Sequence, residues 1–161
     1  MMVSEEQVSP VSLRAPRRDD CERVWEWNFT PDVRARSVSR RIVTYAEHTR
    51  WFAKRIAVDG APIWVIEEHG IGVGVVRLDP VANKWVTPAR LQQAKISIAL
   101  CERARGRGIG RRAIAQACAH WARPVLAEIQ PDNAASVAAF SACGFREIAR
   151  TTELLTYRWH P

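Results

Sequence analysis

Residues 94–122 have the sequence AKISIALCERARGRGIGRRAIAQACAHWA. Its first seven residues place β-branched side chains at alternate positions, which predicts a strand over 94–100. From about Gly108 to Ala122 apolar residues recur at helical spacing, which predicts a helix. Between the two lies a short segment of alternating arginine and glycine: Arg105, Gly106, Arg107, Gly108, Ile109 and Gly110. The stretch therefore predicts a strand, a loop and a helix in succession.

This loop has the chemistry of an anion site. The first N–H groups of a helix have no intrahelical partner, and they lie at the positive end of the helix dipole. Glycines let backbone amides approach phosphate oxygens closely, and Arg105, Arg107 and Arg111 can add charge-assisted hydrogen bonds. The spacing matches neither a P-loop nor a Rossmann loop. The sequence therefore favours a phosphate site of another type over the alternative, a glycine turn before a basic helix.

A second segment follows one strand later, with the sequence NAASVAAFSACGF over residues 133–145. Asn133 is a favourable N-cap, and Gly144 suits the left-handed position that follows the end of a helix. Phe140 and Phe145 then have the spacing of the hydrophobic contact in a Schellman motif. The segment predicts a helix over 133–143 that is capped at both ends.

Together the two segments resemble the signatures of the GNAT superfamily of acyl-CoA N-acyltransferases. The first is R-x-x-G-x-G at Arg105, Gly108 and Gly110, and the second is an N-x-x-S helix that ends in Gly-Phe. The resemblance implies an α+β fold, with a central mixed, mostly antiparallel sheet, splayed strands and flanking helices. It covers nearly the whole chain, so we expect one N-acyltransferase domain over 11–161.

The rest of the chain agrees with this organisation. Strands are predicted at about 11–14, 63–68, 71–78, 125–129 and 151–159, and helices at about 19–27, 31–36 and 44–57. The helix at 44–57 begins with a Thr44–Glu47 capping box, and His69-Gly70 predicts a hairpin turn. Residues 1–10 are expected to be a loose lead-in, and 80–93 a longer loop that contains Trp85.

Composition excludes several classes of protein. The 161 residues and 18.2 kDa are about the size of one domain. No apolar run is long enough for a membrane helix, and the N-terminus lacks the apolar core of a signal peptide. The four cysteines form no C-x-x-C pair, so we expect no disulfide framework, no metal site and a cytoplasmic location. The net charge of +7 attracts anions of any kind.

The resemblance also implies a site. Acetyl-CoA would be the co-substrate, with its pyrophosphate on the backbone amides of the Arg/Gly loop. Main-chain atoms of the preceding strand would bind the pantetheine arm, and an asparagine would contact the cofactor's amide region. The residues that match these positions are Ile98, Leu100, Arg105, Gly106, Arg107, Gly108, Ile109, Gly110, Arg111 and Asn133.

The mechanism that the family implies is direct attack of a neutral amine on the thioester. Two positions depart from the family pattern: Phe140 stands where many relatives have a proton-donating tyrosine, and Lys95 where relatives often have an acidic residue. The candidate bases are His48, since imidazole titrates near neutral pH, and Glu26, which lies between two tryptophans. A packed core histidine is the alternative interpretation of His48.

The acceptor is open at this stage. The run from Val24 to Arg34, with Glu47-His48 and Trp51-Phe52, is similar to a subgroup acting on nucleotide-linked amino sugars, although Asn28-Phe29 replaces a polar pair of that subgroup. The alternatives are a protein N-terminus, a lysine or a small amine. Two alternatives are not enzymes: a non-catalytic acyl-CoA sensor and a nucleic-acid-binding module. The arginine cluster lacks the interleaved aromatic residues that are typical of a nucleic-acid-binding module. No membrane partner is expected.

Overall fold

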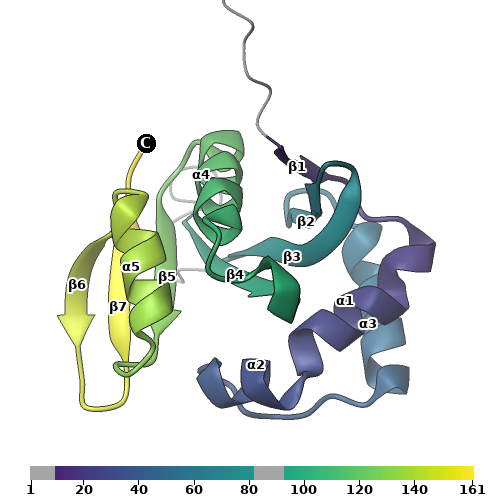
Figure 1. Ribbon diagram of the computed structural model, residues 1–161, viewed down its shortest axis with the longest axis horizontal. Coiled ribbons are helices and arrows are strands. Elements are labelled where there is room, and N and C mark those ends of the chain that lie inside the picture. The colour runs from purple at the N-terminus through teal and green to yellow at the C-terminus, as the bar shows by residue number, and fades with distance from the viewer. Residues whose placement is uncertain (1–9, 82–92) are drawn as a thin grey trace, which may run out of the picture.

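The computed structural model describes residues 10–81 and 93–161 (Figure 1). The elements over these residues are β1 (Val11–Arg14), α1 (Cys21–Phe29), α2 (Pro31–Arg36), α3 (Tyr45–Ile56), β2 (Ile63–Glu68), β3 (Ile71–Pro80), β4 (Ala94–Leu100), α4 (Ile109–Trp121), β5 (Val125–Ile129), α5 (Ala134–Ala142), β6 (Arg146–Arg150) and β7 (Leu155–Trp159). Short 3-10 turns, η1 (Arg18–Asp20) and η2 (Glu102–Ala104), precede α1 and follow β4. The expected lead-in, apart from residue 10, and the loop around Trp85 lie outside the described residues.

All the described strands belong to one sheet in the order β1-β2-β3-β4-β5-β7-β6. The pairing is antiparallel except between β4 and β5, which run parallel. These two strands pair only at Ala94 with Val125 and at Lys95 with Leu126, and then they part. The expected mixed, mostly antiparallel sheet with splayed strands is therefore confirmed.

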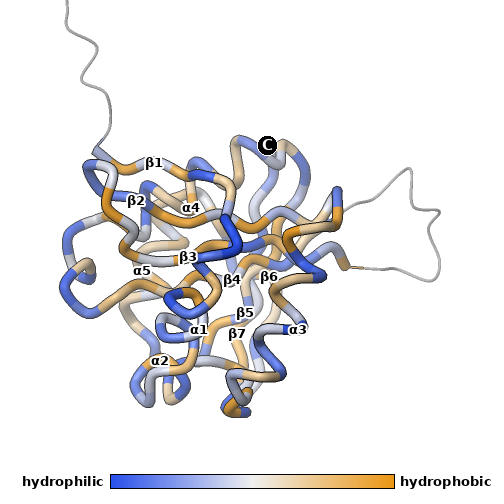
Figure 2. Tube along the Cα trace, turned by 90° about the vertical axis from the view of Figure 1, so that its right-hand side faces the viewer, coloured by the Kyte–Doolittle hydropathy of each residue, from blue (hydrophilic) through white to orange (hydrophobic). Residues whose placement is uncertain are grey.

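Helices cover both faces of this sheet. One core cluster joins α4 and α5 to residues of the strands such as Ile66 and Ile96, and the other joins α1 and α3 to Val65 and Ala99. Alternate residues of β2 and of β4 thus enter opposite clusters, as the period of a strand requires. Figure 2 shows that strongly hydrophilic segments lie mainly in the turns and helix surfaces around this centre.

Local hydrogen bonds confirm the predicted caps. In the capping box of α3, Glu47 donates its N–H to the Thr44 hydroxyl at 3.2 Å, and Thr44 donates its N–H to the Glu47 carboxylate at 3.0 Å. At the end of α5, the N–H of Phe145 donates to the carbonyl of Phe140 at 3.1 Å, and the rings of these two residues lie 5.0 Å apart. The start of α3 and the end of α5 therefore follow the predicted motifs.

The C-terminal strand prediction was wrong in one respect. The structure has β7 over Leu155–Trp159, inside the strand predicted over 151–159, and also β6 over Arg146–Arg150, where the sequence predicted no strand. Every residue of β6 is exposed, so its polar sequence has none of the alternation by which a strand is recognised. It is held as an edge strand by pairing with β7. Smaller differences are that α1 extends to Phe29 and β3 to Pro80.

Gly74 sets the contact between β3 and β4. A Cβ added there would overlap the carbonyl oxygen of Ala99 and would lie 2.8 Å from Cδ2 of Leu100. Backbone cannot move aside as a flexible side chain can, so we expect Gly74→Ala to lower the free energy of unfolding by about 1–3 kcal/mol. Urea denaturation would measure it, with Gly72→Ala as the control because its neighbours are side-chain atoms at 3.3 Å or more. Equal losses in the two variants would contradict this explanation.

Candidate active site

A cleft of about 1140 Å³ opens where β4 and β5 part. Its lining comes from both faces of the sheet. On the α4 side it is formed by the loop over 105–110, the start of α4 and the inner surface of α5. On the α2 side it is formed by the end of α1, by α2 and residues 37–39, and by the charged side chains of Arg77, Asp79, Lys95 and Glu128. The cleft therefore connects the two faces through the gap in the sheet.

The loop on the α4 side has an open backbone. Gly106 and Gly108 have φ angles of 71° and 78°, in the left-handed region that only glycine adopts readily. Apart from its chain neighbours, no heavy atom of the described residues lies within 4 Å of a Cβ built at either glycine, and Gly108 is the N-cap of α4. The unsatisfied N–H groups of the first turn, from Ile109 onward, therefore begin beside open space. This is the cradle that the sequence predicts for a phosphate group.

The main chain of β4 faces the gap at alternate residues. At one end, Ala94 donates its N–H to Pro124, on the side of β5, and at the other Cys101 donates to Val73 of β3. The register between β3 and β4 is continuous, so the polar groups of even-numbered residues point away from β3. Ile98 and Leu100 thus turn their main-chain N–H and C=O groups toward the cleft.

Arg105 joins three parts of the site. Its guanidinium donates from Nε and Nη2 to the carbonyl of Leu100, at 3.2 Å and 3.0 Å, and from Nη1 to the carboxylate of Asp32 on α2. The hydrogen bond from Arg105 is the main cause that lowers the pKa of Asp32 from 3.8 to about 2. On the β5 side, Gln130 donates to the carbonyl of Ser37 at 2.6 Å. α2 is therefore held over the cleft from both walls.

The Asp32–Arg105 pair makes folding stability depend on pH. Because the folded pKa of Asp32 lies below the unfolded value, the stabilisation is present above about pH 4 and is lost as pH falls through 2. The pair is half exposed, so we expect Asp32→Asn to cost less than about 1 kcal/mol at neutral pH. The difference in urea midpoint from wild type should vanish near pH 2. Asp59→Asn changes an exposed aspartate far from the cleft, and a similar pH dependence there would contradict the assignment.

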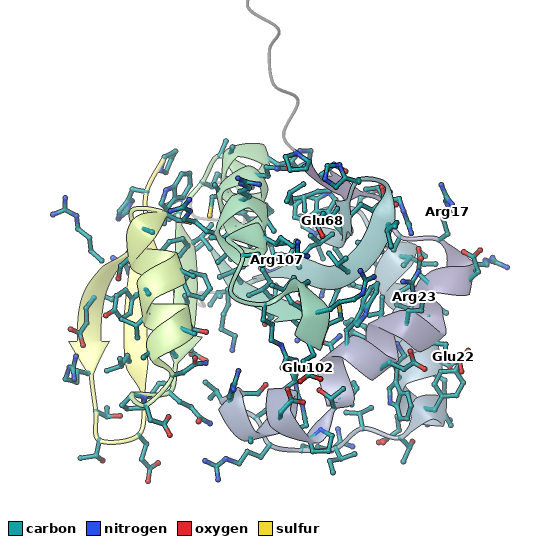
Figure 3. The ribbon with its side chains drawn as sticks, in the orientation of Figure 1. Arg17, Glu22, Arg23, Glu68, Glu102 and Arg107 are labelled. Atoms are coloured by element: carbon teal, nitrogen blue, oxygen red, sulfur yellow. The ribbon has the colours of Figure 1, made fainter. Side chains whose placement is uncertain are left out.

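The other loop arginines have different surroundings. Arg107 donates both terminal nitrogens to the carboxylate of Glu68 on β2, at 2.8 Å and 2.6 Å, and the two side chains meet in Figure 3. This pair lowers the pKa of Glu68 and raises the pKa of Arg107. Arg111 lines the cleft, as do Arg105 and Arg107. In this structure the guanidiniums of Arg105 and Arg107 are thus already bonded to carboxylates, which the sequence did not indicate.

α5 forms the opposite wall. The side chain of Asn133 accepts the N–H of Ser136 at 3.2 Å, as the N-cap prediction requires, and Asn133 also lines the cleft. Phe140 lines the cleft as well, although its ring is 5% exposed and packs edge-on against Phe145. A phenyl ring has no proton to donate, so the wall is apolar at this position.

The structure does not bring His48 or Glu26 into the cleft lining. His48 is 2% exposed, its Nε2 lies 2.9 Å from the carbonyl oxygen of Cys21, and its ring stacks on Phe52. Burial is the main cause that lowers its pKa, which keeps the imidazole neutral. Glu26 is exposed on α1. These positions fit a packed core histidine and a solvated surface carboxylate.

The sequence interpretation missed Glu128 of β5. Its carboxylate lies 3.2 Å from Nζ of Lys95 on β4, and both side chains line the α2 side of the cleft. In the sequence Glu128 is a polar residue in an alternating strand, and nothing distinguishes it from a solvated position. Its place becomes visible only in the structure, where the parallel register of β4 and β5 puts Glu128 just beyond the point where the strands part.

Residues 10–81 and 93–161 contain neither a candidate metal site nor a candidate membrane span. No group of three or more histidine, cysteine, aspartate or glutamate side chains is arranged there to hold a metal ion. None of the helices described there has the length and apolar character needed to cross a membrane.

Comparison with known proteins agrees with this geometry. A family model described as an acetyltransferase (GNAT) domain matches residues 11–146. No curated protein sequence matches the chain. Among solved structures, the chain is similar to spermidine N-acetyltransferase from Vibrio cholerae in complex with CoA and spermine, with a TM-score of 0.79 and 17% identity over 93% of this chain and 95% of that one.

Two further solved structures are similar to the chain over most of its length. Ribosomal-protein-alanine N-acetyltransferase from Brucella melitensis has a TM-score of 0.74 and 23% identity, over 93% of this chain and 99% of that one. A phosphinothricin acetyltransferase from Sinorhizobium meliloti in complex with acetyl-CoA has a TM-score of 0.77 and 20% identity, over 93% and 88%. At these identities the structures establish the fold alone, and they name three different kinds of acceptor.

Proposed function

We propose that this chain, which belongs to the GNAT family of acetyltransferases, acetylates a primary amine that enters its cleft beside α2. Membership of the family makes it an acetyl-CoA-dependent N-acetyltransferase. The observation that carries the proposal is the parting of β4 from β5 after two residue pairs, because it leaves one cleft open to both faces of the sheet. A donor on the α4 side and an acceptor on the α2 side can meet there.

The donor half of the proposal assigns acetyl-CoA to the α4 side. The amides of the loop and of the first turn of α4 would bind the pyrophosphate, with Arg111 beside them. Main-chain groups of β4 would hold the pantetheine arm, and Asn133 would contact its amide region. Open space over Gly106 and Gly108, and main-chain groups of Ile98 and Leu100 that face the gap, support this assignment.

The reaction needs a proton acceptor, a base or water, and we propose that the chain supplies it. The acceptor ammonium must lose one proton to a base before its nitrogen bonds to the acetyl carbon, and the nitrogen gives a second proton to solvent as the carbon–sulfur bond breaks. CoA leaves as a thiolate, which takes up a proton. Glu128 is the carboxylate we propose for the first proton, because it lines the α2 side next to the gap. Phe140 cannot protonate the leaving group, so we assign that step to solvent.

For the acceptor we propose the amine of a nucleotide-linked amino sugar. The run from Val24 to Arg34 is similar to a GNAT subgroup that acts on nucleotide-linked amino sugars, and this similarity supports the substrate. The surplus of positive charge over the whole chain supports it as well. The named activities of the similar structures provide the competing candidates: a polyamine, a protein N-terminus and a small amino acid analogue.

The deciding experiment measures thiol release from acetyl-CoA with a panel of amines. The panel contains a nucleotide-linked amino sugar, the free amino sugar, spermidine, a peptide with N-terminal alanine, and phosphinothricin. We expect fastest turnover with the nucleotide-linked amino sugar, confirmed by mass gain of one acetyl group on its amine. Faster turnover of any other amine would replace that acceptor, and no acetylation of any amine, despite acetyl-CoA binding, would contradict the proposal as a whole.

A further inference from the structure

Two arginines contact the carboxylate of Asp79, which lines the α2 side of the cleft, and a third arginine lines the same cleft. Asp79 of β3 accepts from Arg55 of α3 at 2.5 Å through Oδ1 and from Arg77 at 3.0 Å through Oδ2. Arg34 of α2 and Arg77 line the same cleft, and the positive charge of Arg77 contributes to a lowered pKa of Arg34. Three positive charges against one negative charge leave this corner with a surplus of two.

Of the three arginines Arg34, Arg55 and Arg77, only Arg34 has no carboxylate partner in the described part of the chain. Over the residues that the structure describes, none of the ion pairs includes it. Its Nε donates to the carbonyl of Asn28 at 2.7 Å and its Nη1 to the carbonyl of Ser39 at 2.9 Å. The guanidinium carbon lies 4.8 Å from the centre of the Phe29 ring. These contacts fix the orientation of the guanidinium, but carbonyls and a phenyl ring do not neutralise its charge.

The position is electrostatically unfavourable for a lone cation. Burial, and then the positive charge of Arg77, lower the pKa of Arg34. An arginine nevertheless stays protonated in proteins, so the charge is present at every physiological pH. A half-buried charge of this kind costs free energy until an anion neutralises it. Because Arg34 and Arg77 both line the cleft, an anion that enters the cleft can reach them.

We infer that Arg34 and Arg77 form a subsite for an anionic group, a phosphate or a carboxylate, carried by the acceptor. Nε and Nη1 of Arg34 already donate to carbonyls, so its Nη2 and the guanidinium of Arg77 would donate to the oxygens of either anion. This inference rests on the proposed function, since it assigns the acceptor to the α2 side. It narrows the acceptor to an amine that also bears negative charge, and it disfavours a polyamine.

The first test needs only the wild-type protein. Thiol release is measured with pairs of amines that differ in one anionic group: glucosamine 6-phosphate with glucosamine for phosphate, and an amino acid with its amide for carboxylate. We expect kcat/KM to be roughly 10- to 100-fold higher for the charged member of at least one pair. The pair that shows the preference identifies which of the two anions the subsite takes.

The second test assigns that preference to Arg34. In Arg34→Gln the KM for the charged acceptor should rise by roughly the same factor, with kcat, the neutral acceptor and the Kd of acetyl-CoA almost unchanged. Arg34→Lys keeps the positive charge but removes the planar guanidinium, so it should retain part of the preference for the charged acceptor. Arg40→Gln removes an exposed arginine outside the cleft and should behave as wild type.

The outcomes separate the two proposals. Acetylation of amines without any preference for the charged members would overturn the subsite and leave the proposed function standing. The same holds if Arg34→Gln slows charged and neutral acceptors equally, or changes neither. Absence of acetylation with every amine, in a wild-type protein that binds acetyl-CoA, would instead contradict the proposed function.

Discussion

Gly108→Trp should weaken acetyl-CoA binding by at least about 100-fold, measured by calorimetric titration. Gly108 is the N-cap of α4, and the space over its Cα is open. An indole there would fill the cradle and separate the loop amides from the pyrophosphate. Each hydrogen bond to a charged group contributes about 1.5–3 kcal/mol, so the loss of two of them gives the expected factor.

Gly70 provides a matched control for this variant. It has the same φ angle of 78° as Gly108, and its surroundings are equally open, but it lies in the turn between β2 and β3. Gly70→Trp therefore imposes the same backbone strain outside the cleft, and we expect unchanged affinity. Unchanged affinity in Gly108→Trp, or equal losses in both variants, would show that the loop does not hold the pyrophosphate.

Glu128→Gln should lower kcat by about 100-fold at neutral pH while the Kd of acetyl-CoA stays unchanged. Glutamine keeps the size of the side chain but cannot accept a proton, and general-base assistance contributes typically about 10²–10⁴ in rate. The deficit should narrow as pH rises toward about 10, where a primary amine loses its proton without help. The measurement is a pH profile of thiol release for the two proteins.

The control for this prediction is Glu147→Gln. Glu147 lies on β6, away from the cleft, and pairs with Arg150 at 2.6 Å, so the substitution removes an ion-paired carboxylate of the same sheet. It should leave the profile unchanged. A deficit in Glu128→Gln that is the same at every pH would show that Glu128 acts in some way other than by accepting a proton.

The parts of this protein that the sequence predicted are those that neighbouring residues determine. The Asn133 cap, the Gly144 terminus and the Thr44–Glu47 capping box each depend on hydrogen bonds within a few residues, and each was confirmed. The loop before α4 was predicted on the same grounds, since its glycines and its place between a strand and a helix are visible in the chain itself. What these elements bind remains a proposal.

Contacts between distant elements could not be predicted in this way. The ion pair between Asp32 and Arg105 joins residues 73 positions apart, and Arg34 approaches Arg77 only because α2 folds over the sheet. The amphipathic pattern of α3 placed His48 on its apolar side, but could not tell a core contact from a cleft. β6 escaped prediction because an exposed edge strand has no hydrophobic period.

The parting of β4 from β5 has a consequence for the solubility of the protein. It creates an open strand edge in the middle of a sheet, and unpaired edges elsewhere invite pairing with other chains. Here Arg105 already satisfies the carbonyl of Leu100 at the mouth of the gap, and α2 is tied across it. These contacts therefore hinder pairing of the exposed backbone with a strand of another chain. If the cleft binds acetyl-CoA as proposed, the amides of the pantetheine arm would hydrogen-bond to the open edge of β4, as the backbone of a neighbouring strand would.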